Sequence, residues 1–143
     1  MFKKILVPVN LQNTALAEKA IGLAVDKAQT SGASLVVMAV APGFGMPIVA
    51  SFFPEDAVRE ALQEIARQLK AYIAENIPSE LDTTAVVTEG NPAEQIINQA
   101  REVNADLIIM PSNDQAMEQV LLGSVSARVA RHAHCSVLVV KGN

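Results

Sequence analysis

The sequence predicts an α/β fold in which helices cover both faces of a parallel sheet. Short apolar runs alternate with longer segments of helical periodicity, a pattern typical of parallel strands joined by right-handed crossovers. Half of the residues are hydrophobic but only 3% are aromatic, so the core is expected to consist of Ala, Val, Leu and Ile. We therefore expect residues 1–143 to form a single-domain flavodoxin/Rossmann-like three-layer sandwich. Its five-stranded parallel sheet would have the order 3-2-1-4-5, with four helices.

The first part of the chain predicts a strand, a helix and a second strand. The run from Ile5 to Val9 is short and apolar, as in a strand buried on both faces. Asn13 or Thr14 is placed to cap the next helix, and Gly32 suits a left-handed cap at its end. The second apolar run extends from Leu35 to Val40. Between the two runs, apolar residues recur at helical spacing: Leu16, Ala20, Leu23, Ala24 and Ala28.

A long amphipathic helix and a third strand occupy the middle of the chain. The helix is predicted to begin at Pro54 and to end before Pro78, with one apolar stripe of Val58, Leu62, Ile65, Leu69, Tyr72 and Ile73. The run from Thr83 to Thr88 is rich in β-branched residues and predicts a strand. The connection before the helix, residues 41–53, is apolar. It is expected either to pack on the sheet or to act as a lid or partner contact.

The last third predicts two more helices and two more strands. Asn91 is placed to cap a helix, with Pro92 at the first position and Glu94 able to reach back to the cap. The run from Asp106 to Met110 reads as a buried strand. The run from Val137 to Val140 is the last strand, and in this topology it lies at an edge of the sheet.

Charge and cysteine content narrow the classes of partner. The chain has 15 Asp and Glu residues against 11 Lys and Arg, without a basic block, so neither nucleic acid nor an anionic membrane surface is an expected partner. No apolar run approaches a membrane span, and the N-terminal run stops at Pro8, too early for a signal peptide. The single cysteine, Cys135, excludes an internal disulfide and fits a reducing compartment. We therefore expect a cytoplasmic location.

Gly123-Ser124 is the strongest candidate site, because it opens a helix soon after a buried strand. The first turn of a helix leaves N–H groups unpaired beside a partial positive charge, and can hold a phosphate or a ribose hydroxyl. The preceding strand would deliver this end to the carboxyl edge of the sheet, where ligands of open α/β folds bind. The alternative is a plain helix start capped by Ser124. Asn10 likewise reads either as a pocket residue or as an Asx-turn.

His132, His134 and Cys135 are residue types that bind metals. No metal site is expected, since a short segment passing from a helix into a strand rarely aims three ligands at one ion. Arg131 and His132 are instead expected to complement the C-terminus of the helix, and Cys135 to be a small core residue.

Six segments stand in a specific order and spacing: Ile5-Leu6-Val7-Pro8-Val9-Asn10, Glu89-Gly90-Asn91-Pro92, Asp106-Leu107-Ile108-Ile109-Met110, Leu121-Leu122-Gly123-Ser124-Val125, Arg131-His132-Ala133 and Val137-Leu138-Val139-Val140. Together they resemble the universal stress protein family over the whole chain. The resemblance implies a small dimeric stress-response protein, with a two-fold dimer formed through the strand from Val137 to Val140. It also implies ATP or AMP bound at the carboxyl ends of the first and fourth strands, as in many members.

Carried over by position, the resemblance implies a set of nucleotide-binding residues. Asn10 stands where the family usually has Asp, and the backbone of Val40 would read the adenine edge. The full set is Pro8, Val9, Asn10, Val40, Met110, Pro111, Gly123, Ser124 and Val125.

The chain departs from the family pattern where the phosphates would lie. Pro111 and Asp114 replace two glycines, and the connection to Gly123 is one residue shorter, as in the branch typified by universal stress proteins F and G. Pro111 has no N–H, and losing one charge-assisted hydrogen bond weakens binding roughly ten- to a hundredfold. Asp114 adds repulsion unless Mg²⁺ bridges it to the phosphates. We therefore expect ATP to lose its usual advantage in binding affinity over AMP.

Two functions from different classes follow from these residues. The first is a stress protein in which bound adenine nucleotide alters the dimer state or the choice of partner. The second is a dimeric interaction module whose degenerate pocket binds no nucleotide. Enzymatic activity is not expected, because no Ser/His/acid set or carboxylate pair can be assembled at the switch point. Slow ATP hydrolysis or self-modification stays open, although Ser124 has no adjacent base.

Overall fold

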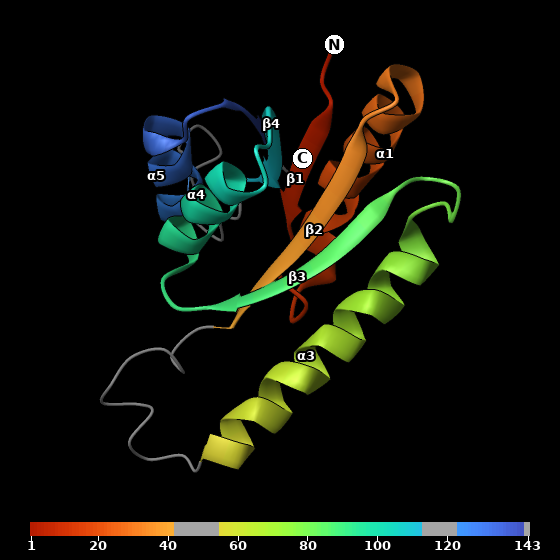
Figure 1. Ribbon diagram of the computed structural model, residues 1–143. Helices are drawn as coiled ribbons and strands as arrows, with labels where there is room; N and C mark the ends of the chain where they lie inside the picture. Colours follow the sequence, from red (N-terminus) through yellow and green to blue (C-terminus); the bar gives the residue numbers. More distant parts are fainter. Residues whose placement is uncertain (42–54, 113–122, 142–143) are drawn as a thin grey trace.

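Five parallel strands form one sheet in the computed structural model, which describes residues 1–41, 55–112 and 123–141. The strands are β1 (Lys4–Pro8), β2 (Ser34–Ala41), β3 (Thr83–Glu89), β4 (Leu107–Pro111) and β5 (Ser136–Val140). Their order across the sheet is β3-β2-β1-β4-β5, and every neighbouring pair is parallel (Figure 1). The predicted strand order is confirmed, with strand ends that differ from the predicted ones by a residue or so.

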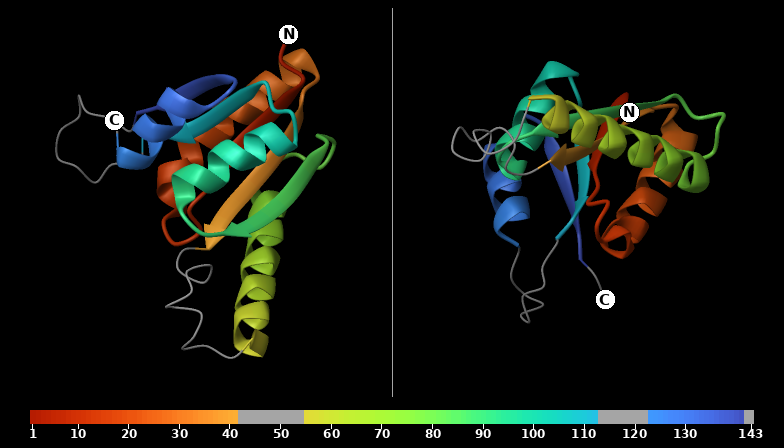
Figure 2. Two further views of the ribbon diagram at one scale, coloured as in Figure 1. Left: turned by 60° about the vertical axis from the view of Figure 1, so that its left-hand side comes forward. Right: turned by 90° about the horizontal axis from the view of Figure 1, so that it is seen from below.

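Helices cover both faces of this sheet. In the described ranges they are α1 (Glu18–Ser31), α3 (Glu55–Asn76), α4 (Pro92–Glu102) and α5 (Ser124–His132), with a 3-10 helix, η1 (Thr14–Ala17), before α1. Helices α1 and α3 pack on one face and α4 and α5 on the other, as two further views show (Figure 2). The predicted three-layer arrangement with four helices is therefore confirmed.

Strict alternation of side chains along the central strands builds a separate core on each face. Ile5 and Val7 of β1 belong to the core under α1 and α3, whereas Leu6 between them belongs to the core under α4 and α5. Because all three are fully buried, β1 has no polar face, as expected for a central parallel strand. Burial of this kind contributes about 1.5–3 kcal/mol for each large aliphatic side chain.

The end of α1 and the start of α4 have the capping residues that the sequence predicts, but the start of α1 does not. Gly32 ends α1 with φ of 77°, and the Asn91 side chain accepts the Glu94 N–H at the start of α4, as predicted. The prediction that Asn13 or Thr14 caps α1 is wrong. The chain first makes η1, and Asn13 accepts the Leu16 N–H through its backbone carbonyl at 3.2 Å. Its side chain makes no capping bond.

The apolar stripe of α3 is buried only in part. Leu69 is fully buried, and Ile65, although partly exposed, packs against the same core. Val58 and Leu62 are also partly exposed and belong to neither core. The reason is geometric, since the first half of α3 runs past the end of the sheet (Figure 1). The alternatives predicted for the connection before α3 fall on residues 42–53, which lie outside the described residues. No helix in the described ranges is long and apolar enough to cross a membrane.

Asp106 joins the starts of the two central strands. Its carboxylate accepts the Lys3 N–H at 2.8 Å and the Lys4 N–H at 3.1 Å, and its own N–H donates to the Lys4 carbonyl at 3.0 Å. Hydrogen bonds to a charged group are stronger than those between neutral groups. Asp106 therefore holds β1 beside β4 at the end of the sheet opposite the carboxyl edge.

Replacing Asp106 with Asn should lower the free energy of unfolding by about 1–2 kcal/mol, because the amide nitrogen cannot accept an N–H. Urea denaturation followed by circular dichroism measures the change. The matched control is Asp26→Asn on α1, an exposed residue whose carboxylate makes no hydrogen bond to the described part of the chain. Equal losses in the two variants would show that Asp106 does not hold the strands together.

Candidate functional site

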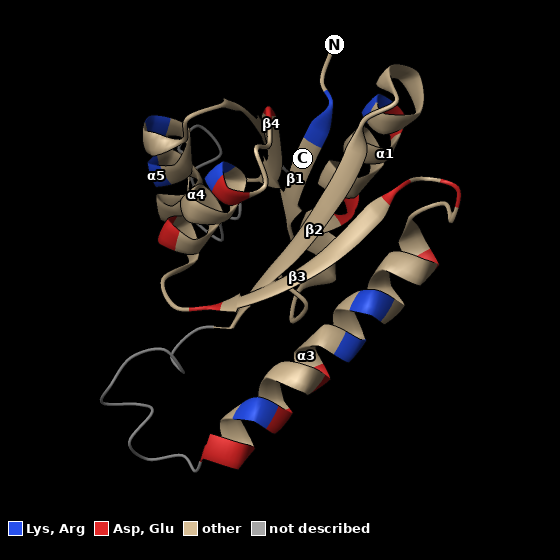
Figure 3. Cartoon of the chain, viewed as in Figure 1, with Lys and Arg blue, Asp and Glu red and all other residues tan. Residues whose placement is uncertain are grey.

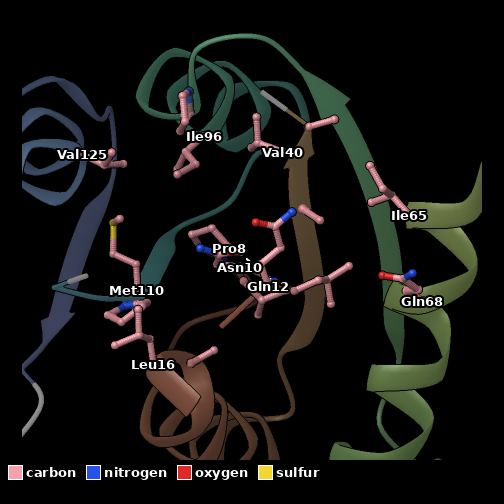
Figure 4. A pocket seen from close by; sticks show the side chains of 17 residues that line it. Pro8, Asn10, Gln12, Leu16, Val40, Ile65, Gln68, Ile96, Met110 and Val125 are labelled. Atoms are coloured by element: carbon pink, nitrogen blue, oxygen red, sulfur yellow. Dashed lines mark hydrogen bonds between the residues drawn. The ribbon is translucent and has the colours of Figure 1, made fainter. Parts of the chain in front are cut away.

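A cavity of about 300 Å³ opens at the carboxyl ends of the central strands, where the chain order reverses across the sheet (Figure 4). Its walls come from every layer of the fold. The lining residues are Pro8 at the end of β1, Val9 to Gln12 after it, Leu16 and Ala17 of η1, Ala39 to Ala41 of β2, Ile65 and Gln68 of α3, Pro92 and Ile96 of α4, Met110 and Pro111 of β4, and Val125 of α5. Such a crevice is where open α/β folds bind ligands.

Most of the residues that the sequence singled out meet in this cavity. Those that line it are Pro8, Val9, Asn10, Val40, Met110, Pro111 and Val125. Gly123 and Ser124 do not line it, although they come directly before Val125. Gly123 is buried and Ser124 is exposed. That these residues bind a ligand stays a prediction.

The start of α5 is built differently from the predicted serine cap. Gly123 is the N-cap with φ of −65°, a conformation open to any residue, and Ser124 is the first helical residue. Ser126, which the sequence analysis passed over, is fully buried. Its hydroxyl lies 3.2 Å from the Gly123 carbonyl and 3.3 Å from the Ser112 carbonyl. Ser126 thus ties α5 to the end of β4, and its spacing of three from the buried Val129 was the signal that could have revealed it.

Asn10 makes the Asx-turn that was the simpler of its two interpretations. Its Oδ1 accepts the Gln12 N–H at 3.0 Å, and its backbone carbonyl accepts the Asn13 N–H at 3.0 Å. The Asn10 side chain also lies at the cavity (Figure 4). Its Nδ2 group has no hydrogen bond to the described residues, so it is left as a donor.

The backbone of Val40 faces the cavity because β1 ends before it. The Met38 carbonyl accepts the Val9 N–H at 2.8 Å on one side of β2, and the Ala41 carbonyl accepts the Gly90 N–H at 3.1 Å on the other. Backbone groups alternate between the two sides of a strand, so those of Val40 point the same way as those of Met38. No described backbone group pairs with Val40 there. One N–H and one carbonyl are therefore presented side by side, as the edge of a planar base requires.

The described lining of the cavity is uncharged. Its polar side chains are the amides of Asn10, Gln12 and Gln68, and the Gln68 Nε2 is held by the Glu64 carboxylate at 3.0 Å. Charged residues lie mainly on the outer faces of the helices, above all on α3, where both signs are mixed (Figure 3). The described lining contains no acid, base, hydroxyl or thiol side chain. The described lining therefore offers no side chain for proton transfer or nucleophilic attack.

The histidine and cysteine cluster lies away from the cavity lining. Arg131 and His132 occupy the last turn of α5, as predicted. Cys135 is partly buried and packs against the core under α4 and α5. Burial raises the pKa of its thiol, and the negative charge of Asp106 adds to the effect, so the reactive thiolate is disfavoured. Within the described ranges, no group of three or more candidate ligand residues could hold a metal ion.

Asp114, which was predicted to repel phosphates or to bind Mg²⁺, lies outside the described residues, as do Leu121 and Leu122. The described part of the connection between β4 and α5 consists of Ser112 at one end and Gly123 at the other.

Comparison with known proteins agrees with the fold and with the sequence pattern. The model of the universal stress protein family matches residues 1–141. Universal stress protein MJ0531 of Methanocaldococcus jannaschii is 34% identical over 145 residues, which cover 99% of this chain and 83% of that protein. Universal stress protein G of Shigella flexneri is 28% identical over 147 residues, which cover 99% of this chain and 100% of that protein.

A solved structure has the same architecture. It is described as a universal stress protein in complex with cAMP, and it is 26% identical to this chain with a TM-score of 0.62, covering 98% of this chain and 97% of its own. The strand order, the helices on both faces, and a family match over nearly the whole length point to one conclusion: this chain belongs to the universal stress protein family.

Proposed function

We propose that this protein binds an adenine nucleotide, ATP or AMP, in the cavity at the carboxyl ends of β1 and β4, and that occupancy alters its dimer state or its choice of partner. The observation that carries the proposal is the N–H and carbonyl of Val40 at the cavity edge, which pair with no described backbone group on that side and match the donor and acceptor of an adenine edge. The related structure with cAMP supports the same class of ligand.

The described residues fit the two halves of a nucleotide unequally. The base half meets apolar walls, among them Val9, Val40 and Ile96, together with the Val40 peptide groups. A ribose hydroxyl can accept from the Asn10 Nδ2. The proposed phosphate contacts are the first-turn amides at Gly123, Ser124 and Val125. The described lining holds no carboxylate for Mg²⁺, so a magnesium ion would depend on residues beyond it.

One observation favours the second candidate, a dimeric interaction module with a pocket that binds no nucleotide. Pro111 has no N–H, and the Ser112 N–H is already used by the Val140 carbonyl at 2.9 Å. The end of β4 therefore offers no amide to a phosphate at these two positions.

We assign the site a binding role rather than a catalytic one, since its described lining has no nucleophile and no acid or base. The proposed setting is the cytoplasm, where the lone thiol of Cys135 would stay reduced.

We further propose a homodimer formed through β5, the strand at one edge of the sheet. An edge strand presents unpaired backbone groups that another chain can pair with. Val139 is partly exposed and belongs to neither core, unlike its neighbour Val140, which is buried. An apolar side chain in this position is available for contact with a second copy.

Titration calorimetry with ATP, ADP and AMP tests nucleotide binding. We expect measurable binding of all three, with ATP no more than about threefold tighter than AMP in the absence of metal, because Pro111 removes one phosphate donor. Native mass spectrometry of the protein as purified provides a second readout through carried-over nucleotide. Tight, ATP-selective binding without metal would contradict the expected loss of ATP preference, and no binding of any nucleotide would favour the interaction module.

Replacing Val139 with Lys should convert the dimer to monomers, because a charged ammonium would be buried against its copy in the partner. Sedimentation velocity measures the mass. The matched control is Val58→Lys, which changes another partly exposed valine outside both cores, on α3 far from β5. If both variants remain dimers, the contact between protomers lies elsewhere.

A further inference from the structure

Pro8 and Pro111 face each other across the gap between β1 and β4. The Val9 N–H donates to Met38 of β2, so the backbone groups of Pro8, one residue earlier, point the other way, toward β4. The Ser112 N–H donates to Val140 of β5, so those of Pro111 point toward β1. The two prolines therefore stand on the inner sides of adjacent strands.

This placement ends the pairing of the two strands. Their register pairs Ile5 with Leu107 and Leu6 with Ile108, so its continuation would have Pro8 donate to the Ile109 carbonyl and accept from residue 111. Neither bond can form, because neither proline has an N–H. The β4–β5 ladder continues to Pro111, opposite Val140. We call the part of the cavity between Pro8 of β1 and Pro111 of β4 its floor. There the facing edges of the two strands carry carbonyl acceptors but no N–H donor.

An anion gains little binding free energy at this floor. A phosphate must exchange its water for hydrogen-bond donors or cations, and otherwise it is bound at a net cost. Pro111 has no N–H, the Ser112 N–H is taken by Val140, and the described lining contains no Lys, Arg or His. A hydroxyl or amino group, by contrast, can donate to the carbonyls that the missing ladder bonds leave free.

From this geometry we infer that the cavity recognises the uncharged nucleoside part of its ligand, and that Pro8 and Pro111 set this specificity. Adenosine then binds at least as tightly as AMP or ATP, because the described floor offers their phosphates no N–H donor and, of the first turn of α5, only Val125 lines the cavity. The inference rests on the proposed adenine site and narrows its ligand from a nucleotide to a nucleoside.

Calorimetry with adenosine, AMP and ATP on ligand-free protein tests the ligand class. The expected result is a dissociation constant for adenosine that equals, within about threefold, or lies below that for AMP. AMP bound tenfold or more tightly than adenosine would overturn the inference and leave the proposed adenine site standing. Absence of binding by all three ligands would instead remove the proposed site, and the inference with it.

The role of Pro111 is tested by giving that position an N–H. Pro111→Gly should tighten AMP binding roughly ten- to a hundredfold and leave adenosine binding unchanged. The pairing of β1 with β4 stops at Leu6 and Ile108, so the new N–H is open to a phosphate, and adenosine has none. Pro111→Ala provides the same N–H with a less flexible backbone, and guards against a folding defect in the glycine variant. Pro78→Ala, after the end of α3 and outside the cavity lining, is the matched control. Unchanged AMP affinity in both folded Pro111 variants would refute the assignment.

Discussion

The central strands β1 and β4 are held together at one end and kept apart at the other, and the site depends on this difference. At their amino ends the Asp106 carboxylate accepts the N–H groups of Lys3 and Lys4. At their carboxyl ends Pro8 and Pro111 remove the donors that would continue the ladder beyond Leu6 and Ile108. Since the strands diverge at the point where the chain order reverses, the opening forms at the place where α/β folds bind ligands.

The recognition proposed for this site relies mainly on peptide groups. Val40 contributes an N–H and a carbonyl, and the diverging strands contribute carbonyls, whereas the described lining has no charged side chain. Peptide groups are present whatever the side chain, so such a site tolerates most substitutions but is sensitive to proline. A member of the family can therefore keep the cavity while its side chains change, and the ligand preference proposed above rests on two prolines.

The two cores on either side of the sheet make this arrangement rigid. Ile5 and Val7 anchor β1 to the layer of α1 and α3, and Leu6 anchors it to the layer of α4 and α5. Ser126 adds a polar link between the start of α5 and the end of β4. Walls from all layers therefore meet around a cavity whose backbone edges are fixed in position.

Several features were determined by the sequence alone, because they depend on local periodicity or on a single residue's conformation. Runs of four to six residues that alternate with helical stripes predicted the sheet order. Gly32 predicted the left-handed cap of α1, and Asn91 predicted the side-chain cap of α4. Other features were decided only by the tertiary structure. The bonds of Asp106 to Lys3 and Lys4, and the meeting of Pro8 with Pro111, join residues about a hundred positions apart. The position of Asn13 outside the helix it was predicted to cap depends on how the turn at Asn10 meets η1. Periodicity reports which side chains are buried, but not which backbone groups of neighbouring strands face each other, since that is set by the register of distant segments.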